Sequence, residues 1–357
     1  MRITPLNQSH KDLGAKMVEF AGWEMPIQYR GVREEHDCVR KDVGLFDVSH
    51  MGEIRFKGPK ALESLQWLTS NDVSKLNDGK AHYSLLTNET GGIVDDIIVY
   101  CLKQNSDYLV CVNAANIEKD FKWMLAHNKG ADVTNESDRW GQIAVQGPKS
   151  LDLGAKIFGS NLLDLAYFSF APFEFGSSTV YVARTGYTGE KGFEVFVPAE
   201  ATAALWSEFL EKGSDLGVQP IGLAARDTLR TEMKYSLYGH EISDTTNPYE
   251  AELGWVVKPK KGEFVGKGPI LAGKEAGITK KLVGFKMLEK GIPRQGYLLK
   301  NESGGEIGVV TSGTMSPSLG EPIGIGYVSS EFGEVGAQFL VEIRGKTFKA
   351  HVVKTPF

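Results

Sequence analysis

Two adjacent carboxylates interrupt an apolar run that otherwise has the composition of a β-strand. Asp95 and Asp96 lie within IVDDIIVY, residues 93–100, where strand propensity disfavours aspartate at both positions. Because side chains alternate between the two faces of a strand, Asp96 shares a face with Tyr100 and Asp95 takes the other. A carboxylate among apolar side chains needs a ligand or a cation to offset its burial, so one of the two is a candidate for chemistry. A strand-end cap or a salt bridge remains the alternative for either.

A glycine-rich segment, RTGYTGEKGFE at residues 184–194, resembles a phosphate-binding loop only superficially. It lacks the terminal GK[ST] of a P-loop, and a hairpin between strands at 180–184 and 193–197 explains its glycines by turn geometry. Glu194 lies on the strand face opposite Phe193 and Val195. Its carboxylate is therefore a candidate to project into a cavity beneath the hairpin.

Two arginines stand on one apolar stripe of a predicted helix, GLAARDTLRTEMKYSLYGHEI, at residues 222–242. The members of the stripe are Arg226, Leu229, Arg230, Met233 and Leu237, at three- and four-residue spacing. A guanidinium stays charged when buried and binds planar or bidentate partners, so Arg226 suits a carboxylate or a polar heterocycle. A structural ion pair is the alternative.

Asp47, Ser49 and His50, in FDVSHMG, invite comparison with a hydrolase triad. A triad is defined by spatial roles and not by closeness in sequence, so this interpretation is disfavoured. The seven histidines show no HExxH or other metal-ligand spacing, and no metal site is predicted.

The elements that must position these side chains have the pattern of an α+β protein. Residues 53–140 predict a small ferredoxin-like unit. Its predicted elements are a strand at 53–57, a helix at 59–69, strands near Tyr83, Ile97 and Val110, and a helix at 117–128 with the apolar stripe Ile117, Phe121, Met124 and Leu125. A second unit resumes with helices expected from Lys149 and over 201–212, and residues 1–52 are expected to pack with it, giving a discontinuous domain of 1–52 plus 141–255.

The pattern changes in the last part of the chain to short β-runs separated by Gly, Pro and Ser turns. These runs are LVGFKM, EIGVVTSG, IGIGYV, QFLVEI and FKAHVV. They predict a C-terminal β-barrel or jelly-roll-like domain at residues 280–357. Residues 256–279 are dense in Lys, Gly and Pro and are predicted to form a linker.

Composition excludes several classes of function. The chain carries 40 Lys and Arg against 45 Asp and Glu, and the net charge of -5 offers no broad positive field for nucleic acid. The three cysteines, Cys38, Cys101 and Cys111, are widely spaced, which is typical of reduced thiols. No run approaches the roughly 20 apolar residues of a membrane span, and no leader pattern precedes residue 10, so a soluble cytoplasmic protein is expected.

Several motifs together resemble the aminomethyltransferase family of the glycine cleavage system. They are FAGWEMP, VGLFDVSHMGE, GGIVDDIIVY, VNAANIEKD, RTGYTGEKGFE, GLAARDTLR, TNPYEAELGWVVK, FVGK and TSGTMSPSLG. The resemblance covers essentially the whole chain. It implies a three-domain fold, with a ferredoxin-like insert and a β-rich third domain around a central folate cavity. Family members often continue past the segment that matches VVKTPF, and this chain stops at Phe357.

The resemblance also implies roles for individual residues. Asp96 matches the family's catalytic aspartate beside the pterin, which selects it over Asp95. The residues that match folate-binding positions are Glu194, Arg226, Tyr83, Tyr100, Asn113, Tyr187, Tyr235 and Met51. The implied reaction moves the methylene carbon of aminomethyl-lipoyl H-protein to tetrahydrofolate, giving 5,10-methylenetetrahydrofolate, ammonia and dihydrolipoyl H-protein, with no metal or nucleotide cofactor.

The implied partner is lipoylated H-protein, bound transiently by a monomeric enzyme. Lys258, Lys260, Lys261 and Lys267 are a candidate basic patch for steering it, and a solvated linker is the alternative. Two other functions within the same fold are weighed. An iron-sulfur cluster assembly factor would carry a Lys-Gly-Cys motif, and the comparable segment here reads KYSLYGHE. A sarcosine or dimethylglycine demethylase would be joined to a flavin oxidoreductase, for which a 357-residue chain has no room.

Overall fold

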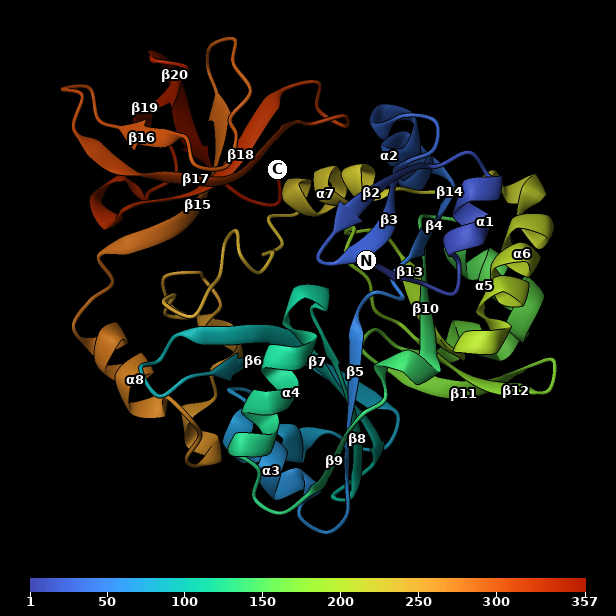
Figure 1. Ribbon diagram of the computed structural model, residues 1–357. Coiled ribbons are helices and arrows are strands. Elements are labelled where there is room, and N and C mark those ends of the chain that lie inside the picture. The colour runs from blue at the N-terminus through green and yellow to red at the C-terminus, as the bar shows by residue number, and fades with distance from the viewer. The chain divides into compact units, whose positions relative to one another are not determined.

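The computed structural model describes residues 1–357, and the chain divides into two compact units. The first comprises residues 1–68, 72–84 and 97–227, and the second comprises 69–71, 85–96 and 228–357. Figure 1 shows the helices and strands of both. The three-domain division expected from the sequence stays a prediction.

Helices and strands mix throughout the chain, as the α+β prediction requires. The strands are β1 Arg2–Ile3, β2 Lys16–Phe20, β3 Trp23–Gln28, β4 Val43–Asp47, β5 Gly52–Lys57, β6 Lys80–Thr87, β7 Ile93–Lys103, β8 Asp107–Val112, β9 Asp132–Asn135, β10 Trp140–Gln146, β11 Phe170–Phe175, β12 Ser178–Ala183, β13 Gly192–Pro198, β14 Val218–Pro220, β15 Lys280–Met287, β16 Leu298–Lys300, β17 Glu306–Met315, β18 Pro322–Ser329, β19 Gln338–Ile343 and β20 Lys346–Val353. The helices are α1 Asn7–Asp12, α2 Val32–Lys41, α3 Ala61–Leu68, α4 Ile117–Ala126, α5 Ser150–Phe158, α6 Thr202–Lys212, α7 Leu223–Glu232 and α8 Lys267–Glu275.

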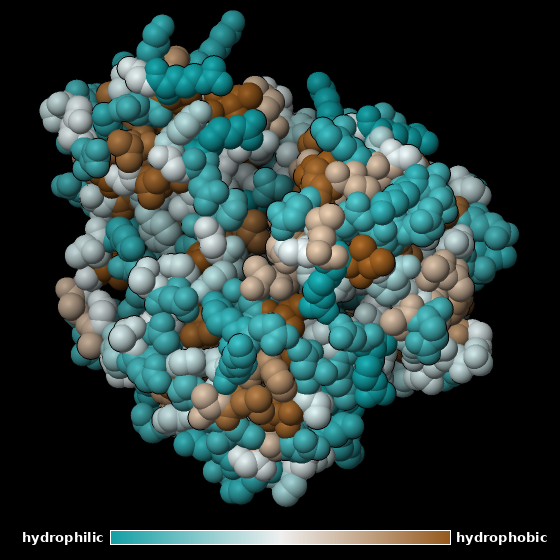
Figure 2. All heavy atoms as spheres, in the orientation of Figure 1, coloured by the Kyte–Doolittle hydropathy of each residue, from teal (hydrophilic) through white to brown (hydrophobic).

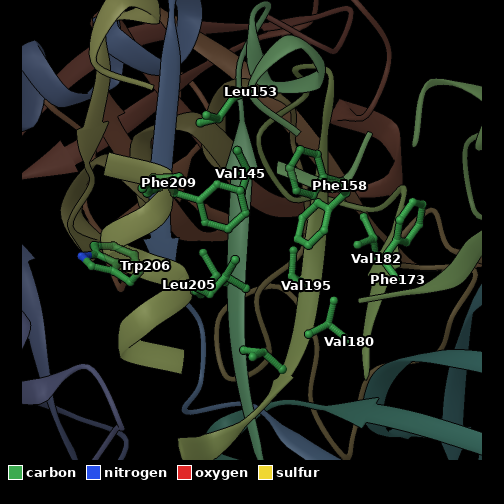
Figure 3. Close-up of a cluster of buried hydrophobic side chains, with 14 of the residues drawn as sticks. Val145, Leu153, Phe158, Phe173, Val180, Val182, Val195, Leu205, Trp206 and Phe209 are labelled. Atoms are coloured by element: carbon green, nitrogen blue, oxygen red, sulfur yellow. The ribbon is translucent and has the colours of Figure 1, made fainter. Parts of the chain in front are cut away.

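A six-stranded sheet in the order β11-β12-β13-β10-β4-β14 forms the centre of the first unit. One face of β10 and β13 carries Val145 and Val195, which pack against Leu205 and Phe209 of α6 (Figure 3). Helix α5 approaches the same face so closely that a Cβ on Gly154 would lie 2.7 Å from the ring of Phe193. The opposite face of β13 carries Glu194 together with Phe196.

The ferredoxin-like insert is confirmed in its connectivity. Its five-stranded sheet has the order β6-β7-β8-β5-β9. Strands β5, β7, β8 and β9, with α3 after β5 and α4 after β8, follow the β-α-β-β-α-β path, and β6 is an added edge strand. One expectation for α4 is wrong: Ile117 and Met124 are buried, but Leu125 is 47% exposed. Residues seven apart share a helix face, whereas Leu125 is turned about 100° away from Met124.

The insert sheet packs against the six-stranded sheet within the first unit. Tyr100 of β7 and Cys111 of β8 belong to one buried cluster with Phe170 of β11 and Phe196 of β13. The tyrosine ring meets Phe170 and Phe196 edge-on, at centroid distances of 5.5 and 5.2 Å. Burial of large aromatic side chains is among the strongest contributions to a core, so this cluster fixes the two sheets together.

The second unit contains the predicted C-terminal barrel, which is confirmed as a closed six-stranded barrel. Its strand order is β15-β18-β17-β16-β19-β20, coloured orange to red in Figure 1. Val283, Phe285 and Phe339 lie in its interior cluster, while Leu282 packs on the other face of β15, as strand alternation requires. A Cβ on Gly324 would lie 2.3 Å from the Phe285 ring, which explains the glycine.

The segment predicted as a linker, residues 256–279, is ordered and includes helix α8. Phe264 and Ile270 are buried there, in one cluster with Val257. The segment therefore has a small apolar core of its own within the second unit.

The helix predicted over residues 222–242 is too long, because α7 ends at Glu232. The amides of Met233 and Tyr235 both donate to the carbonyl of Arg230, and Lys234 has φ +55°, which reverses the chain. Continuing the helix would carry Glu241 about 16 Å along the axis from Arg230. Instead, the reversal lets the two form a buried ion pair at 2.9 Å.

Figure 2 shows one face of the molecule, where hydrophilic side chains predominate and apolar ones gather in small separate patches. None of the helices combines the length and the apolar character that crossing a membrane would require.

Candidate active site

Glu194 stands on the face of β13 that is turned away from α5 and α6. Strand alternation sends Phe193 and Val195 into the apolar cluster beneath α5 and α6, and it sends Glu194 to the face that carries Phe196. The hydroxyl of Thr185 donates a hydrogen bond to Oε2 of Glu194. Burial raises the pKa of the Glu194 carboxyl, and the Thr185 hydrogen bond and the charge of Arg226 partly oppose this effect. A carboxyl group placed in this way is sensitive to any ligand that brings N–H donors.

Arg226 lies beside two aromatic groups of the first unit. Its guanidinium stacks over the ring of Tyr187 with the carbon 4.5 Å from the ring centroid. The imidazole of His50 is buried, and burial and the Arg226 charge lower its pKa to about 4, with Asp47 opposing. His50 is therefore neutral near pH 7.

Tyr100 links the aromatic cluster to Glu194. Its hydroxyl lies 3.4 Å from Oγ1 of Thr185, and only 1% of the residue is exposed. Burial and the nearby Glu194 charge raise the pKa of Tyr100 well above its ordinary value, so the phenol stays protonated. Met51 packs against the same cluster. Tyr100, Thr185 and Glu194 thus form one connected polar group, here called the Glu194 group.

The hairpin predicted around the glycine-rich segment is confirmed by antiparallel pairing of β12 with β13. The reason for its glycines is only partly turn geometry. Gly189 has φ +82°, but Cβ atoms on Gly186 and Gly192 would lie 2.1 and 2.3 Å from the side chain of Gln146. Gln146 is buried under this loop and donates from Nε2 to the carbonyl of Thr185 at 3.2 Å. The glycines therefore let the loop close over a glutamine that helps to place Thr185.

The two aspartates of β7 differ as strand alternation predicts. Asp95 is fully buried, whereas Asp96 is half-buried on the face that continues to Ile98 and Tyr100. Asp96 and Tyr235 belong to the second unit. Each is half-buried there.

The remaining predicted folate residues lie in the first unit. Tyr83 is half-buried on β6, and Asn113 is half-buried directly after β8, where its carbonyl accepts from the amide of Asn116. The structure brings Tyr100 and Glu194 into one group, and Tyr187 against Arg226.

The hydrolase interpretation of Asp47, Ser49 and His50 does not fit the geometry. Asp47 accepts from Nε2 of His10 at 2.8 Å and from the hydroxyl of Thr4 at 2.6 Å, and Nδ1 of His50 makes no hydrogen bond. The aspartate therefore orients His10 and not the histidine of its own motif.

Sequence reasoning missed Thr185 and Gln146 as parts of this region, and it considered His50 only as a member of the disfavoured triad. Thr185 stands inside the glycine-rich motif beside Gly186. Its role becomes visible only in the folded structure, where its hydroxyl donates a hydrogen bond to Glu194. The signal for Gln146 is a polar side chain at the end of an otherwise apolar strand, IAVQ.

Two family models match the chain in succession. Residues 6–261 match the GCVT N-terminal domain, and residues 280–357 match the glycine cleavage T-protein C-terminal barrel domain. The chain is 64% identical to an aminomethyltransferase of Bdellovibrio bacteriovorus, covering 100% of this chain and 99% of the relative. It is 50% identical to an aminomethyltransferase of Chloroherpeton thalassium over the same shares of the two chains.

A solved structure gives the same result for the fold. The crystal structure of glycine cleavage system aminomethyltransferase T from Bartonella henselae superposes with a TM-score of 0.92 at 35% identity, covering 99% of this chain and 97% of that one. Both family models, full-length relatives and a full-length structural match agree, so this chain belongs to the aminomethyltransferase family of the glycine cleavage system.

Proposed function

We propose that the chain transfers the methylene carbon of aminomethyl-lipoyl H-protein to tetrahydrofolate. The products are 5,10-methylenetetrahydrofolate, ammonia and dihydrolipoyl H-protein. The observation that carries this proposal is the 64% identity to an aminomethyltransferase along the full length of both chains.

We assign folate recognition to Glu194 and Arg226. The family resemblance adds six further folate-binding positions, which are Met51, Tyr83, Tyr100, Asn113, Tyr187 and Tyr235. The pterin ring presents N–H donors, and a carboxylate that already accepts from Thr185 has further lone pairs for them. Arg226 places its guanidinium on the face of Tyr187. A guanidinium in this position suits either the carbonyl oxygen of the pterin or a carboxylate of the folate.

The transfer replaces two bonds of the methylene carbon with two others. Its bonds to the amino nitrogen and to the lipoyl sulfur break, and bonds to N5 and N10 of tetrahydrofolate form. The two protons displaced from N5 and N10 end on ammonia and on the thiol, so no electron acceptor is needed. In this proposal Asp96 is the catalytic residue: it orients the folate as N5 attacks and stabilises the positive charge that develops, or assists proton transfer.

The partner proposed for the reaction is lipoylated H-protein. The four lysines of the candidate steering patch differ in exposure and in hydrogen bonding. Lys261 donates to the carbonyls of Thr69 and Asn71, and Lys267 donates to Glu263 at 2.8 Å. Lys258 and Lys260 are exposed. Steering of an acidic partner is therefore assigned to Lys258 and Lys260. The monomeric state and the cytoplasmic location remain predictions.

The test is a coupled assay with tetrahydrofolate and aminomethyl-loaded H-protein. We expect 5,10-methylenetetrahydrofolate and ammonia in equal amounts, with none formed when the H-protein lacks lipoate. Tight folate binding without any product would instead favour the non-catalytic iron-sulfur assembly alternative.

A further inference from the structure

Glu35 is a buried carboxylate outside the Glu194 group. It lies on α2 with no exposed surface. Its Oε1 accepts from three successive amides, those of Tyr29, Arg30 and Gly31, at 2.7, 2.9 and 3.1 Å. Its Oε2 accepts from the amide of Gly222 at 2.7 Å. The two oxygens therefore tie the loop at residues 29–31 to Gly222, which lies 187 positions after Glu35 in the chain.

Gly222 immediately precedes α7, whose first residue is Leu223. The preceding amide, that of Ile221, donates to the carbonyl of Leu45 on β4 at 2.8 Å. A Cβ on Gly222 would lie 2.3 Å from the carbonyl oxygen of Ile27, so the backbone of β3 presses against this point. The start of α7 is thus fixed by β3, by β4 and by the Glu35 carboxylate.

Arg226 stands one turn further along the same helix. Its amide donates to the carbonyl of Gly222 at 3.2 Å, in the first turn of α7. A shift of Gly222 is therefore transmitted directly to Arg226 and to its stacking on Tyr187. The Glu35 carboxylate suits this place because charged acceptors form the stronger hydrogen bonds and because negative charge is favourable at a helix N-terminus.

We propose that Glu35 is a positioning residue for folate binding, which acts through Gly222 to hold Arg226 over Tyr187. This inference rests on the proposed function. It assigns to Glu35 no contact with the folate.

The variant Glu35→Gln tests the proposal with almost no change in volume. If the amide oxygen keeps the three loop amides, the amide nitrogen must face the N–H of Gly222, and two donors then oppose each other. The start of α7 should move, and the dissociation constant for tetrahydrofolate should rise about tenfold. The value of kcat at saturating folate should stay within about twofold, because Asp96 is untouched.

A double-mutant cycle separates positioning from a general loss of stability. Folate dissociation constants are measured by calorimetry for the wild type, Glu35→Gln, Arg226→Ala and the double variant. If Glu35 acts through Arg226, the double variant should bind folate as weakly as Arg226→Ala alone. Glu34→Gln is the matched control, because Glu34 precedes Glu35 on α2 but is 56% exposed and pairs only with Arg30. It should leave folate affinity unchanged.

The measured folate dissociation constants distinguish the positioning role from the proposed function. Additive effects in the cycle, or a Glu35→Gln variant with wild-type folate affinity, would overturn the positioning role while leaving the proposed function intact. If Arg226→Ala itself binds folate normally, the folate assignment under the proposed function is wrong, and the positioning role falls with it. Should Glu35→Gln fail to fold, Glu35→Asp takes its place in the cycle, because it keeps the charge and shortens the reach to Gly222; the same two outcomes then apply.

Discussion

Thr185 donates its hydroxyl hydrogen to the carboxyl of Glu194, and this contact joins the end of β12 to β13. The same hydroxyl oxygen lies 3.4 Å from the phenol of Tyr100. The protonation of Glu194 is thereby coupled to two groups that do not ionise near neutral pH.

Folate affinity should fall at acid pH as Glu194 becomes protonated. Burial raises the pKa of this carboxyl, and its ionised form accepts from N–H donors through both oxygens, whereas protonation turns one oxygen into an O–H donor. Affinity should be complete above the raised pKa and lost as the pH drops through it, at a pH above the ordinary value for glutamate. Titration of the tetrahydrofolate dissociation constant against pH measures this.

Thr185→Val supplies the matched comparison for that titration. The Thr185 hydrogen bond lowers the pKa of Glu194, so its removal should move the loss of affinity to higher pH. The loss of folate affinity at acid pH should shift in Thr185→Val and should disappear in Glu194→Gln. If it stays at the same pH in Thr185→Val, or remains in Glu194→Gln, another group titrates.

Asp96→Asn should depress single-turnover transfer by about 100-fold or more, while folate affinity changes by less than about threefold. The carboxamide keeps the size of the side chain and loses its charge. Rapid-quench measurement with loaded H-protein gives the rate. Asp95→Asn is the neighbouring control: because Asp95 is fully buried, we expect its variant to lose stability without a specific loss of rate in the folded fraction. Equal rates for Asp96→Asn and the wild type would remove Asp96 from the mechanism.

Gly186→Ala should lower the free energy of unfolding by about 1 to 3 kcal/mol, because the new Cβ would lie 2.1 Å from the Gln146 side chain. Shortening the obstructing side chain, in Gly186→Ala with Gln146→Ala, should remove the clash but also the hydrogen bond to Thr185. Gly268→Ala in α8 is the control, since nothing apart from its chain neighbours lies within 4 Å of its Cβ. It should change the free energy of unfolding by less than about 1 kcal/mol, because the better helix propensity of alanine is opposed by the proline that follows. Urea denaturation measures the free energy of unfolding of Gly186→Ala, of the double variant and of Gly268→Ala. A Gly186→Ala variant as stable as the wild type would contradict the close packing of the loop.

Arg230→Ala should cost about 3 to 5 kcal/mol of stability, because it leaves the carboxylate of Glu241 buried without its cation. Arg226→Ala serves as the comparison on the same helix. It should cost only about 1 kcal/mol, since it removes a partly exposed cation–π contact, yet it should weaken folate binding. Denaturant unfolding monitored by tryptophan fluorescence gives the free energy of unfolding of both variants. If the two variants lose equal stability, the division between a structural and a functional arginine fails.

Local periodicity was sufficient to predict much of this protein. The alternation of side chains along a strand placed Asp95 and Asp96 on opposite faces, and Glu194 opposite Phe193, because the period of two depends only on the backbone of that strand. The same rule identified the β-runs of the barrel, and the motifs along the chain were enough to identify the family.

The tertiary structure alone decided which distant side chains meet. The hydrogen bond between Glu35 and Gly222 joins residues 187 positions apart, and nothing local to either marks the other. The end of α7 was mispredicted for a related reason: helical spacing continues past Glu232, but the reversal at Lys234 is favoured by the pair that Arg230 forms with Glu241. Sequence periodicity reports the backbone within one element, whereas such pairs depend on the path of the chain between elements, and so only the folded structure reveals them.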